Sequence, residues 1–400
     1  MAVKTNCTKA GTKYYRITIT VGKDNLGKFI RKDFYGKSKS EAESLRDEYL
    51  NNINSGLDIN YRDKSLGDLM HTWLFEVVRV ASKPATFERY ESIYRNYIKS
   101  NPVNNDLPSL FNLKIYDIKP IQLQRYYNDL YANNKSSNVI KNLNKFLKTF
   151  FNYAYEEGYI LKNPCIGKKI VIPRNSEVNE DSEESKEFSI FTEEEIKSFQ
   201  KSIEKNRIRA LFVLALATGL RRGELLGLKW NDIDFDSKEL KVQRSVKRVT
   251  LINEKEEREG KIIVQLPKTK TSIRTVPIPS SVIPILEKHK IQQNKERLKL
   301  GDSYLNNDGY VFTTESGNLI DPRNLLRAYM RALKSGGIMY RKFHNLRHTY
   351  ATRLFEEDVP LKTVQELLGH SDLSVTSNIY THVMPAKKSD AAEKLNRLFY

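Results

Sequence analysis

The sequence predicts a chain of several domains: a small three-stranded β-sheet with one helix, then an all-α domain, then a mixed domain that is mainly α-helical and contains a small β-sheet. Two patterns of apolar residues predict this order. Apolar and polar residues alternate near the N-terminus, as in a half-buried strand, whereas residues 65–166 repeat apolar positions every three or four residues, as in packed helices. Both patterns recur after an acidic stretch. We place the domains at 1–60, 65–168 and 190–400, with a linker at 169–189.

The chain carries a large excess of positive charge. Lys and Arg number 67 and Asp and Glu 49 among 400 residues, which gives a formal net charge of +18. A polyanion such as nucleic acid is therefore the first partner to expect, although an acidic protein or a membrane surface would also fit. Cys7 and Cys165 are too few and too far apart for a disulfide framework or a zinc cluster. Because we find no apolar signal segment and no apolar run of membrane-spanning length, we expect a cytoplasmic protein.

The N-terminal residues predict two paired strands followed by the helix. YYRITITV (14–21) alternates strictly, and KFIRKDFY (28–35) is the expected antiparallel partner across the DNLG turn. Arg16 and Arg31 belong to the outward face of this sheet. A basic sheet face suits insertion into a DNA groove, and an ordinary solvated face is the alternative.

Four amphipathic helical stretches follow. The last is the clearest, because its apolar positions share one side of a helix. These positions are Val139, Leu143, Phe146, Leu147, Phe150 and Ala154. Lys141, Lys145 and Lys148 share another side. Lysines in such a row would contact DNA phosphates without distinguishing base sequence; a helix face that contacts only water is the alternative.

The last domain begins after an acidic stretch. NSEVNEDSEESKEF (175–188) has almost no apolar residues and predicts a disordered hinge. Beyond it, in TGLRRGE, an apolar helix ends at Gly219 and a second helix begins near Arg221. Arg221 beside Glu224 would present an oriented guanidinium to a phosphate, although surface pairs of this kind are common.

Strand-like alternation continues the domain. A short strand is expected around Leu240 and Val242. The apolar runs before and after residues 267–272 predict a hairpin, with Lys268 and Lys270 near its tip. Lysines at such a tip would be mobile and reachable, and an ordinary charged turn is the alternative.

The C-terminal part combines two histidines, an arginine and a tyrosine. In HNLRH, His344 and Arg347 share one helix face. In VQELLGH a helix ends at Gly369, so His370 follows the end of that helix, and Tyr380 lies ten positions later. Taken singly, each histidine would more often be structural than catalytic.

Together these side chains predict a phosphate site that works without metal or nucleotide. The sequence offers no carboxylate cluster for magnesium and no glycine-rich phosphate loop, so we expect no cofactor. Tyr380 is the candidate nucleophile. Since a phenol has a pKa of about 10, surrounding cations must favour the phenolate, and the same cations would neutralise charge on a phosphoryl transition state.

The motifs TGLRRGE, HNLRH, LLGH and NIYTH, in this order and spacing, resemble the catalytic boxes of the tyrosine recombinases, the integrase family. The similarity covers residues 190–400. More weakly, the helical block resembles the family's core-binding domain, and the N-terminal sheet and helix resemble the arm-binding domain of conjugative-transposon and phage integrases. The resemblance implies the fold that tyrosine recombinases share with type IB topoisomerases. It also implies a site-specific recombinase that integrates and excises a mobile element, such as a conjugative transposon or prophage.

The resemblance implies a role for each motif residue. Tyr380 would attack a DNA phosphodiester, giving a 3′-phosphotyrosine and a free 5′-hydroxyl. Arg221 and Arg347 would clamp the scissile phosphate. His344 and His370 would hydrogen-bond it and assist proton transfer.

Two further residues complete the expected site. Lys270 is our choice for protonating the leaving 5′-oxygen, because its spacing to Arg274 fits the family's hairpin better, with Lys268 as the alternative. Glu224 would buttress Arg221. Because some family members carry tryptophan at the position of His370, hydrogen bonding and packing fit this residue better than obligatory proton transfer.

The resemblance also implies partners. These are double-stranded DNA, at core and arm sites of the element ends and target, further copies of the chain in a tetrameric synaptic complex, and an excision factor. After Tyr380, an apolar stripe predicts a tail that docks on a neighbouring protomer, with docking on its own domain as the alternative; the stripe comprises Ala391, Ala392, Leu395 and Leu398. Two rival functions are a type IB topoisomerase, which the N-terminal module disfavours, and an inert DNA-binding regulator, which the filled catalytic positions disfavour.

Overall fold

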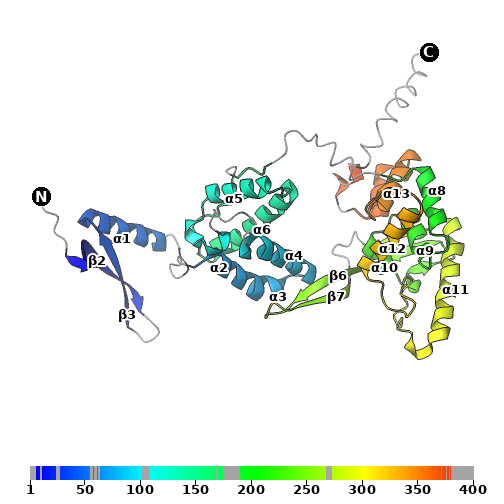
Figure 1. Ribbon diagram of the computed structural model, residues 1–400, viewed down its shortest axis with the longest axis horizontal. Helices are drawn as coiled ribbons and strands as arrows, with labels where there is room; N and C mark the ends of the chain where they lie inside the picture. The colour runs from blue at the N-terminus through cyan, green and yellow to red at the C-terminus, as the bar shows by residue number, and fades with distance from the viewer. Residues whose placement is uncertain are drawn as a thin grey trace, which may run out of the picture. The chain divides into compact units, whose positions relative to one another are not determined.

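The computed structural model of the chain forms two compact units, Met1–Asn175 and Ser176–Tyr400 (Figure 1). The structure describes residues 6–9, 11–23, 28–54, 57, 61, 64–100, 109–167, 170–173, 190–266, 273–370, 372–374, 376, 377 and 379. Every helix within these residues is too short or too polar to traverse a lipid bilayer.

The first unit begins with an antiparallel sheet and a helix. The predicted three-stranded sheet is confirmed, with the order β1-β2-β3. Its elements are β1 (Cys7–Lys9), β2 (Thr12–Lys23), β3 (Phe29–Gly36) and the helix α1 (Lys39–Asn54). The Ser38 hydroxyl accepts the N–H of Glu41 at 3.1 Å, which fixes the start of α1. Phe34, Ala42 and Tyr49 are buried, so the helix supplies the apolar cover that one face of the sheet needs.

The rest of the first unit is helical, as predicted. Its helices are α2 (Leu66–Thr72), the π-helix η2 (Trp73–Val78), α3 (Arg79–Ala81), α4 (Pro84–Tyr94), the π-helix η3 (Arg95–Lys99), the 3₁₀ turns η4 (Leu110–Asn112) and η5 (Ile115–Asp117), α5 (Pro120–Ala132) and α6 (Ser137–Glu156). Trp73 is at the centre of their core, with its ring 5.9 Å from that of Phe146 and 5.4 Å from that of Phe150. The apolar positions predicted for α6 are buried except Val139, which is half-buried.

The second unit packs helices around two small sheets. Its helices are α8 (Glu193–Ser202), α9 (Arg209–Thr218), α10 (Arg222–Leu226), α11 (Ile283–Leu300), α12 (Pro322–Ser335), α13 (Asn345–Glu356) and α14 (Leu361–Leu368), with 3₁₀ turns η6 (Trp230–Asp232), η8 (Ser280–Val282) and η9 (Gly301–Ser303). Phe199, Phe212 and Tyr329 are fully buried and contact one another edge-on or tilted. This aromatic core joins α8, α9 and α12 and so supports the segments that surround the site.

The strands of the second unit correct one prediction. They are β4 (Ile233–Asp234), β5 (Glu239–Val242), β6 (Ser245–Ile252), β7 (Arg258–Gln265) and β8 (Arg274–Pro277), in sheets of order β4-β5-β8 and β6-β7. The predicted hairpin between the runs on either side of residues 267–272 is wrong, because β7 pairs with β6 and β8 pairs with β5. The turn between β6 and β7 is built by Asn253, whose side-chain oxygen accepts the N–H groups of Lys255 and Glu257 at 3.0 and 2.9 Å. Because this short turn directly connects β6 with β7, β7 pairs with β6 and not with β8.

Candidate active site

The turn between α9 and α10 positions Arg221. The preceding helix ends, as predicted, at Gly219, whose φ of +61° lies in the left-handed region. A Cβ at Gly219 would lie 2.4 Å from the ring of Tyr350, so both the backbone and the contact require glycine here. Arg221 then caps α10, with its backbone N–H donating to Glu224 at 2.9 Å and its Nη1 at 2.8 Å. The same carboxylate therefore fixes the backbone and the guanidinium of Arg221.

Arg347 is a buried cation held by neutral groups. Its side chain projects from α13 and the residue is 2 % exposed. Nη1 donates to the carbonyl of Gly219 at 2.9 Å and Nη2 to that of Leu368 at 2.6 Å, whereas Nε has no hydrogen-bond partner among the described residues. Burial, together with the charge of Arg221, lowers the pKa of the Arg347 guanidinium well below its usual range. A buried cation with an unsatisfied donor is suited to bind an anion that enters the site.

His370 follows the end of α14, as predicted. The helix ends at Gly369, with φ +65°. The Gln365 carbonyl accepts the backbone N–H of His370 at 3.2 Å, and the Gln365 side chain donates to the His370 carbonyl at 3.1 Å. The imidazole Nδ1 is 2.8 Å from the hydroxyl of buried Thr376, which leaves Nε2 for the site. Burial and the charges of Arg347 and Arg221 lower the pKa of His370 to about 3, so the ring is neutral at physiological pH.

His344 lies at the start of α13, directly before its first residue. Burial lowers the pKa of His344 to about 4, and the neighbouring His348, Arg347 and Arg221 add to this effect. The rings of His344 and His348 meet edge-on, with centroids 4.7 Å apart. Although protein atoms surround much of the His344 ring, the residue remains exposed to solvent, and this solvent screens the charges of Arg347 and Arg221. A neutral, accessible imidazole can donate and accept hydrogen bonds.

The combined charges of this cluster favour an anion. Glu224 is the carboxylate that pairs with both Arg221 and Arg274, at 2.8 and 3.0 Å. Burial alone would raise the pKa of the Glu224 carboxyl, but its hydrogen bond and ion pair with Arg274, together with the charge of Arg221, lower it. Three guanidinium groups with one carboxylate leave a net positive field, which is suited to a phosphate.

The structure brings five of the predicted residues together: Arg221, Glu224, His344, Arg347 and His370. Lys270, its alternative Lys268, Tyr380, the acidic hinge and the C-terminal apolar stripe lie outside the described residues. Arg274 and Thr376 belong to the cluster but had no role in the sequence-based interpretation. No local pattern identifies Thr376, and the only signal at Arg274 was its spacing from the lysines.

The predicted DNA-binding residues lie in the first unit. Strand pairing sets Arg16 opposite Tyr35 and Thr20 opposite Arg31, so Arg16 and Arg31 share one face of the sheet. Arg16 is not isolated there, because its guanidinium donates to Asp33 at 2.7 Å. The three lysines predicted on α6 are exposed: Lys141, Lys145 and Lys148.

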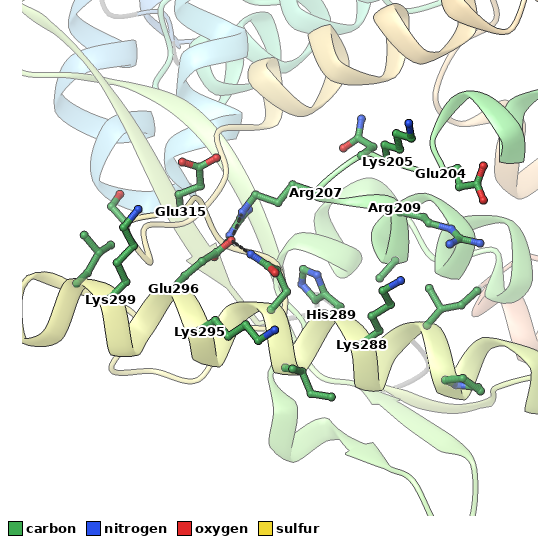
Figure 2. A pocket seen from close by; sticks show the side chains of 18 residues that line it. Glu204, Lys205, Arg207, Arg209, Lys288, His289, Lys295, Glu296, Lys299 and Glu315 are labelled. Atoms are coloured by element: carbon green, nitrogen blue, oxygen red, sulfur yellow. Dashed lines mark hydrogen bonds and ion pairs between the residues drawn. The ribbon is translucent and has the colours of Figure 1, made fainter.

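The predicted site residues do not line the open groove of the second unit. This groove, of about 1150 Å³, lies between the α8–α9 connection and α11 (Figure 2). Arg207 crosses it and donates to Glu296 through Nε at 2.8 Å and Nη2 at 2.6 Å. Within the described ranges, no group of three or more His, Cys, Asp or Glu side chains is arranged to hold a metal ion.

Comparison with known proteins identifies the family. The Phage integrase family matches residues 189–387, and the N-terminal SAM-like domain of phage integrases matches residues 65–131. A protein named tyrosine recombinase XerC-like, from Caldanaerobacter subterraneus subsp. tengcongensis, is 59% identical over 401 residues, covering 100% of both chains. The chain belongs to the tyrosine recombinase family. It is therefore a tyrosine-type site-specific recombinase, and the cluster around Arg347 lies within the residues that match the Phage integrase family.

Several other proteins that are similar to this recombinase are named integrases. The ICEBs1 integrase of Bacillus subtilis is 26% identical and covers 96% of this chain and 97% of its own length. The Tn1549 transposon integrase, in complex with a circular intermediate DNA, shares the fold with a TM-score of 0.62 at 20% identity, over 79% of this chain and 95% of that one. A λ integrase dimer bound to a core site has a TM-score of 0.51 at 20% identity, over 90% and 91% of the two chains. The predicted multidomain, mainly α-helical recombinase fold is confirmed.

Proposed function

We propose that this recombinase integrates and excises a mobile DNA element by cutting and rejoining strands through a 3′-phosphotyrosine intermediate. The observation that carries the chemistry is the buried guanidinium of Arg347, which backbone carbonyls orient and whose Nε lacks a partner among the described residues. Support for a mobile element comes from the ICEBs1 integrase, which matches this chain over nearly its whole length.

In this proposal, Tyr380 supplies the nucleophile. Its phenol oxygen attacks the scissile phosphorus as the neutral imidazole of His344 accepts the phenol proton; the bond from phosphorus to the 5′-oxygen breaks, and a free 5′-hydroxyl forms. Arg221 and Arg347 bind the non-bridging oxygens and neutralise the charge that grows on them. The phosphodiester is exchanged for a phosphotyrosine ester, so the reverse attack by a 5′-hydroxyl of the partner strand reseals DNA without ATP.

The other residues handle protons and orientation. Lys270, or alternatively Lys268, protonates the leaving 5′-oxygen. His344 and His370 are neutral, and their N–H groups hydrogen-bond the phosphate; Thr376 fixes the ring of His370 for this purpose.

The first unit binds DNA in this proposal. Residues 65–168 hold the core site, where Lys141, Lys145 and Lys148 contact phosphates, and residues 1–60 hold the arm site through the face that carries Arg16 and Arg31. The assembly is a homotetramer on paired sites, in which the C-terminal apolar stripe docks on a neighbouring protomer. An excision factor sets the direction of exchange.

Nicked suicide DNA carrying candidate element ends, incubated in EDTA, tests the chemistry. The wild type should give a denaturation-resistant protein–DNA adduct, and Tyr380→Phe should give none. Tight binding without an adduct in the wild type would instead indicate an inert regulator. Relaxation of plasmids that lack the element ends would indicate a topoisomerase, and equal cleavage of unrelated DNA would contradict a role in element transfer.

A further inference from the structure

Arg274, the first residue of β8, donates more side-chain hydrogen bonds to the described residues than either arginine of the proposed phosphate clamp. Its side chain is 6% exposed, compared with 37% for that of Arg221. Nε donates to the carbonyl of Leu367 at 2.7 Å, Nη2 to Glu224 at 3.0 Å and Nη1 to the same carboxylate at 3.4 Å. Each nitrogen of this guanidinium thus donates to a protein acceptor, whereas the Nε of Arg347 has none among the described residues.

The carboxylate that Arg274 holds is the one that orients Arg221. Oε1 of Glu224 accepts Nη1 of both arginines, and Oε2 accepts the backbone N–H of Arg221 and Nη2 of Arg274. Glu224 is 7% exposed, so water does not readily replace a lost partner. The direction in which Arg221 points therefore depends on Arg274 through the shared carboxylate.

A second connection passes through the C-terminal end of α14. Three consecutive carbonyls there each accept a hydrogen bond from a different arginine: Leu367 from Arg274, Leu368 from Arg347 and Gly369 from Arg221. The negative end of the helix dipole favours cations at this position. Arg274 also lies directly against Gly369, where an added Cβ would be 2.9 Å from its Cδ.

We propose that Arg274 is a positioning residue of the recombinase: it fixes Glu224 and the last carbonyls of α14, and through them the two arginines that bind the scissile phosphate. This inference rests on the proposed function. Arg274 acts on the reaction only through Arg221 and Arg347 and does not itself touch DNA.

Arg207 offers a matched control in the same unit. Like Arg274, it donates two hydrogen bonds to one glutamate, Glu296 (Figure 2), and a third to a backbone carbonyl, that of Thr313. Its pair with Glu296 lies in the groove beside α11, with side chains 21% and 12% exposed. Arg207→Gln therefore removes a comparable ion pair without touching the clamp.

The test compares Arg274→Gln, Arg274→Lys and Arg207→Gln with the wild type on nicked suicide DNA. Adduct formation is followed in single turnover at saturating protein, alongside DNA affinity and melting temperature. Arg274→Gln should slow adduct formation on the order of 10- to 100-fold with little change in affinity, and Arg274→Lys should restore part of the rate. Arg207→Gln should lower the melting temperature similarly but keep the rate. Equal rate losses in Arg274→Gln and Arg207→Gln, or no loss in Arg274→Gln, would overturn the proposal.

Two further measurements separate positioning from a general structural effect. In an Arg221→Ala background, Arg274→Gln should slow adduct formation little further, because Arg221, the residue through which Arg274 mainly acts on the phosphate, is already absent. With a neutral methylphosphonate at the scissile position, the defect of Arg274→Gln should shrink, since the phosphate charge that the clamp neutralises is absent. A full, additive defect in both cases would show that Arg274 acts elsewhere. Absence of an adduct from the wild type would count against the proposed function itself, not against Arg274 specifically.

Discussion

Replacing Gly219 by alanine should destabilise the second unit more than the left-handed backbone conformation of this residue alone explains. An alanine at φ +61° costs about 1–2 kcal/mol, of which about 0.4–1 kcal/mol is recovered because the unfolded chain loses freedom. The new Cβ would also lie 2.4 Å from the ring of Tyr350, and displacing a packed ring costs about 1–3 kcal/mol more. The expected total is roughly 1–4.5 kcal/mol.

Gly337→Ala separates the two contributions. Gly337 has a similar φ of +66°, but an added Cβ would meet nothing within 4 Å. Its alanine variant should therefore show only the backbone cost, roughly 0–1.5 kcal/mol. For a unit of this size, the melting temperature of Gly219→Ala should lie roughly 2–12 °C below that of Gly337→Ala.

The same substitution should impair strand cleavage. The Gly219 carbonyl accepts Nη1 of Arg347 at 2.9 Å, so a shifted turn misaligns that guanidinium. A misplacement of about 1 Å can cost about 100-fold in rate, whereas Gly337→Ala should cleave like the wild type. Adduct formation would be measured well below both melting temperatures. If the two variants melt together and cleave equally, then the Tyr350 contact does not constrain the turn and the carbonyl does not orient Arg347.

Two further predictions concern His370. Thr376→Val removes the hydroxyl that lies 2.8 Å from Nδ1 of His370. Strand cleavage should slow by about 10-fold, which corresponds to the loss of one hydrogen bond, while DNA affinity stays unchanged. An unchanged cleavage rate would mean that Thr376 does not orient the ring. The second concerns pH. Because the folded pKa of His370, about 3, lies below the unfolded value, the neutral ring contributes stability above about pH 6.5 that is lost as pH falls towards 3. Between pH 7.5 and pH 5 the free energy of unfolding, measured with urea, should fall by roughly 1–2 kcal/mol after allowance for partial exposure of the ring. The His370→Gln variant should lose less stability over the same range. An equal loss in both proteins would refute the neutral histidine.

The helix ends around the site were predictable because their signals are local. Gly219 and Gly369 end α9 and α14 in the left-handed conformation that glycine favours. Thr192 and Glu195 form the capping box that starts α8. Such signals lie within about one helical turn, so the local sequence is sufficient to predict where these helices begin and end.

Strand partners were not predictable in the same way, because alternation identifies a strand but not its neighbour. The pattern from β6 to β8 fits two pairings, and the side chain of Asn253 decides between them by closing a turn between β6 and β7. Arg274 was missed for a related reason. Its carbonyl partner at Leu367 lies 93 positions away, and no spacing rule connects an arginine with a carbonyl at the end of a distant helix.

The choice of acceptors around the arginines explains how the site can hold cations in place and still neutralise a phosphate. A carboxylate orients a guanidinium but also cancels its charge, whereas a carbonyl orients it and leaves the charge. Arg347 is held by carbonyls alone among the described residues, and Arg221 shares its single carboxylate with Arg274. Burying Arg347 without a paired carboxylate is unfavourable in the free protein. In the proposed function, binding of the scissile phosphate relieves that unfavourable state, and part of the affinity for the phosphate would come from the instability of the empty site.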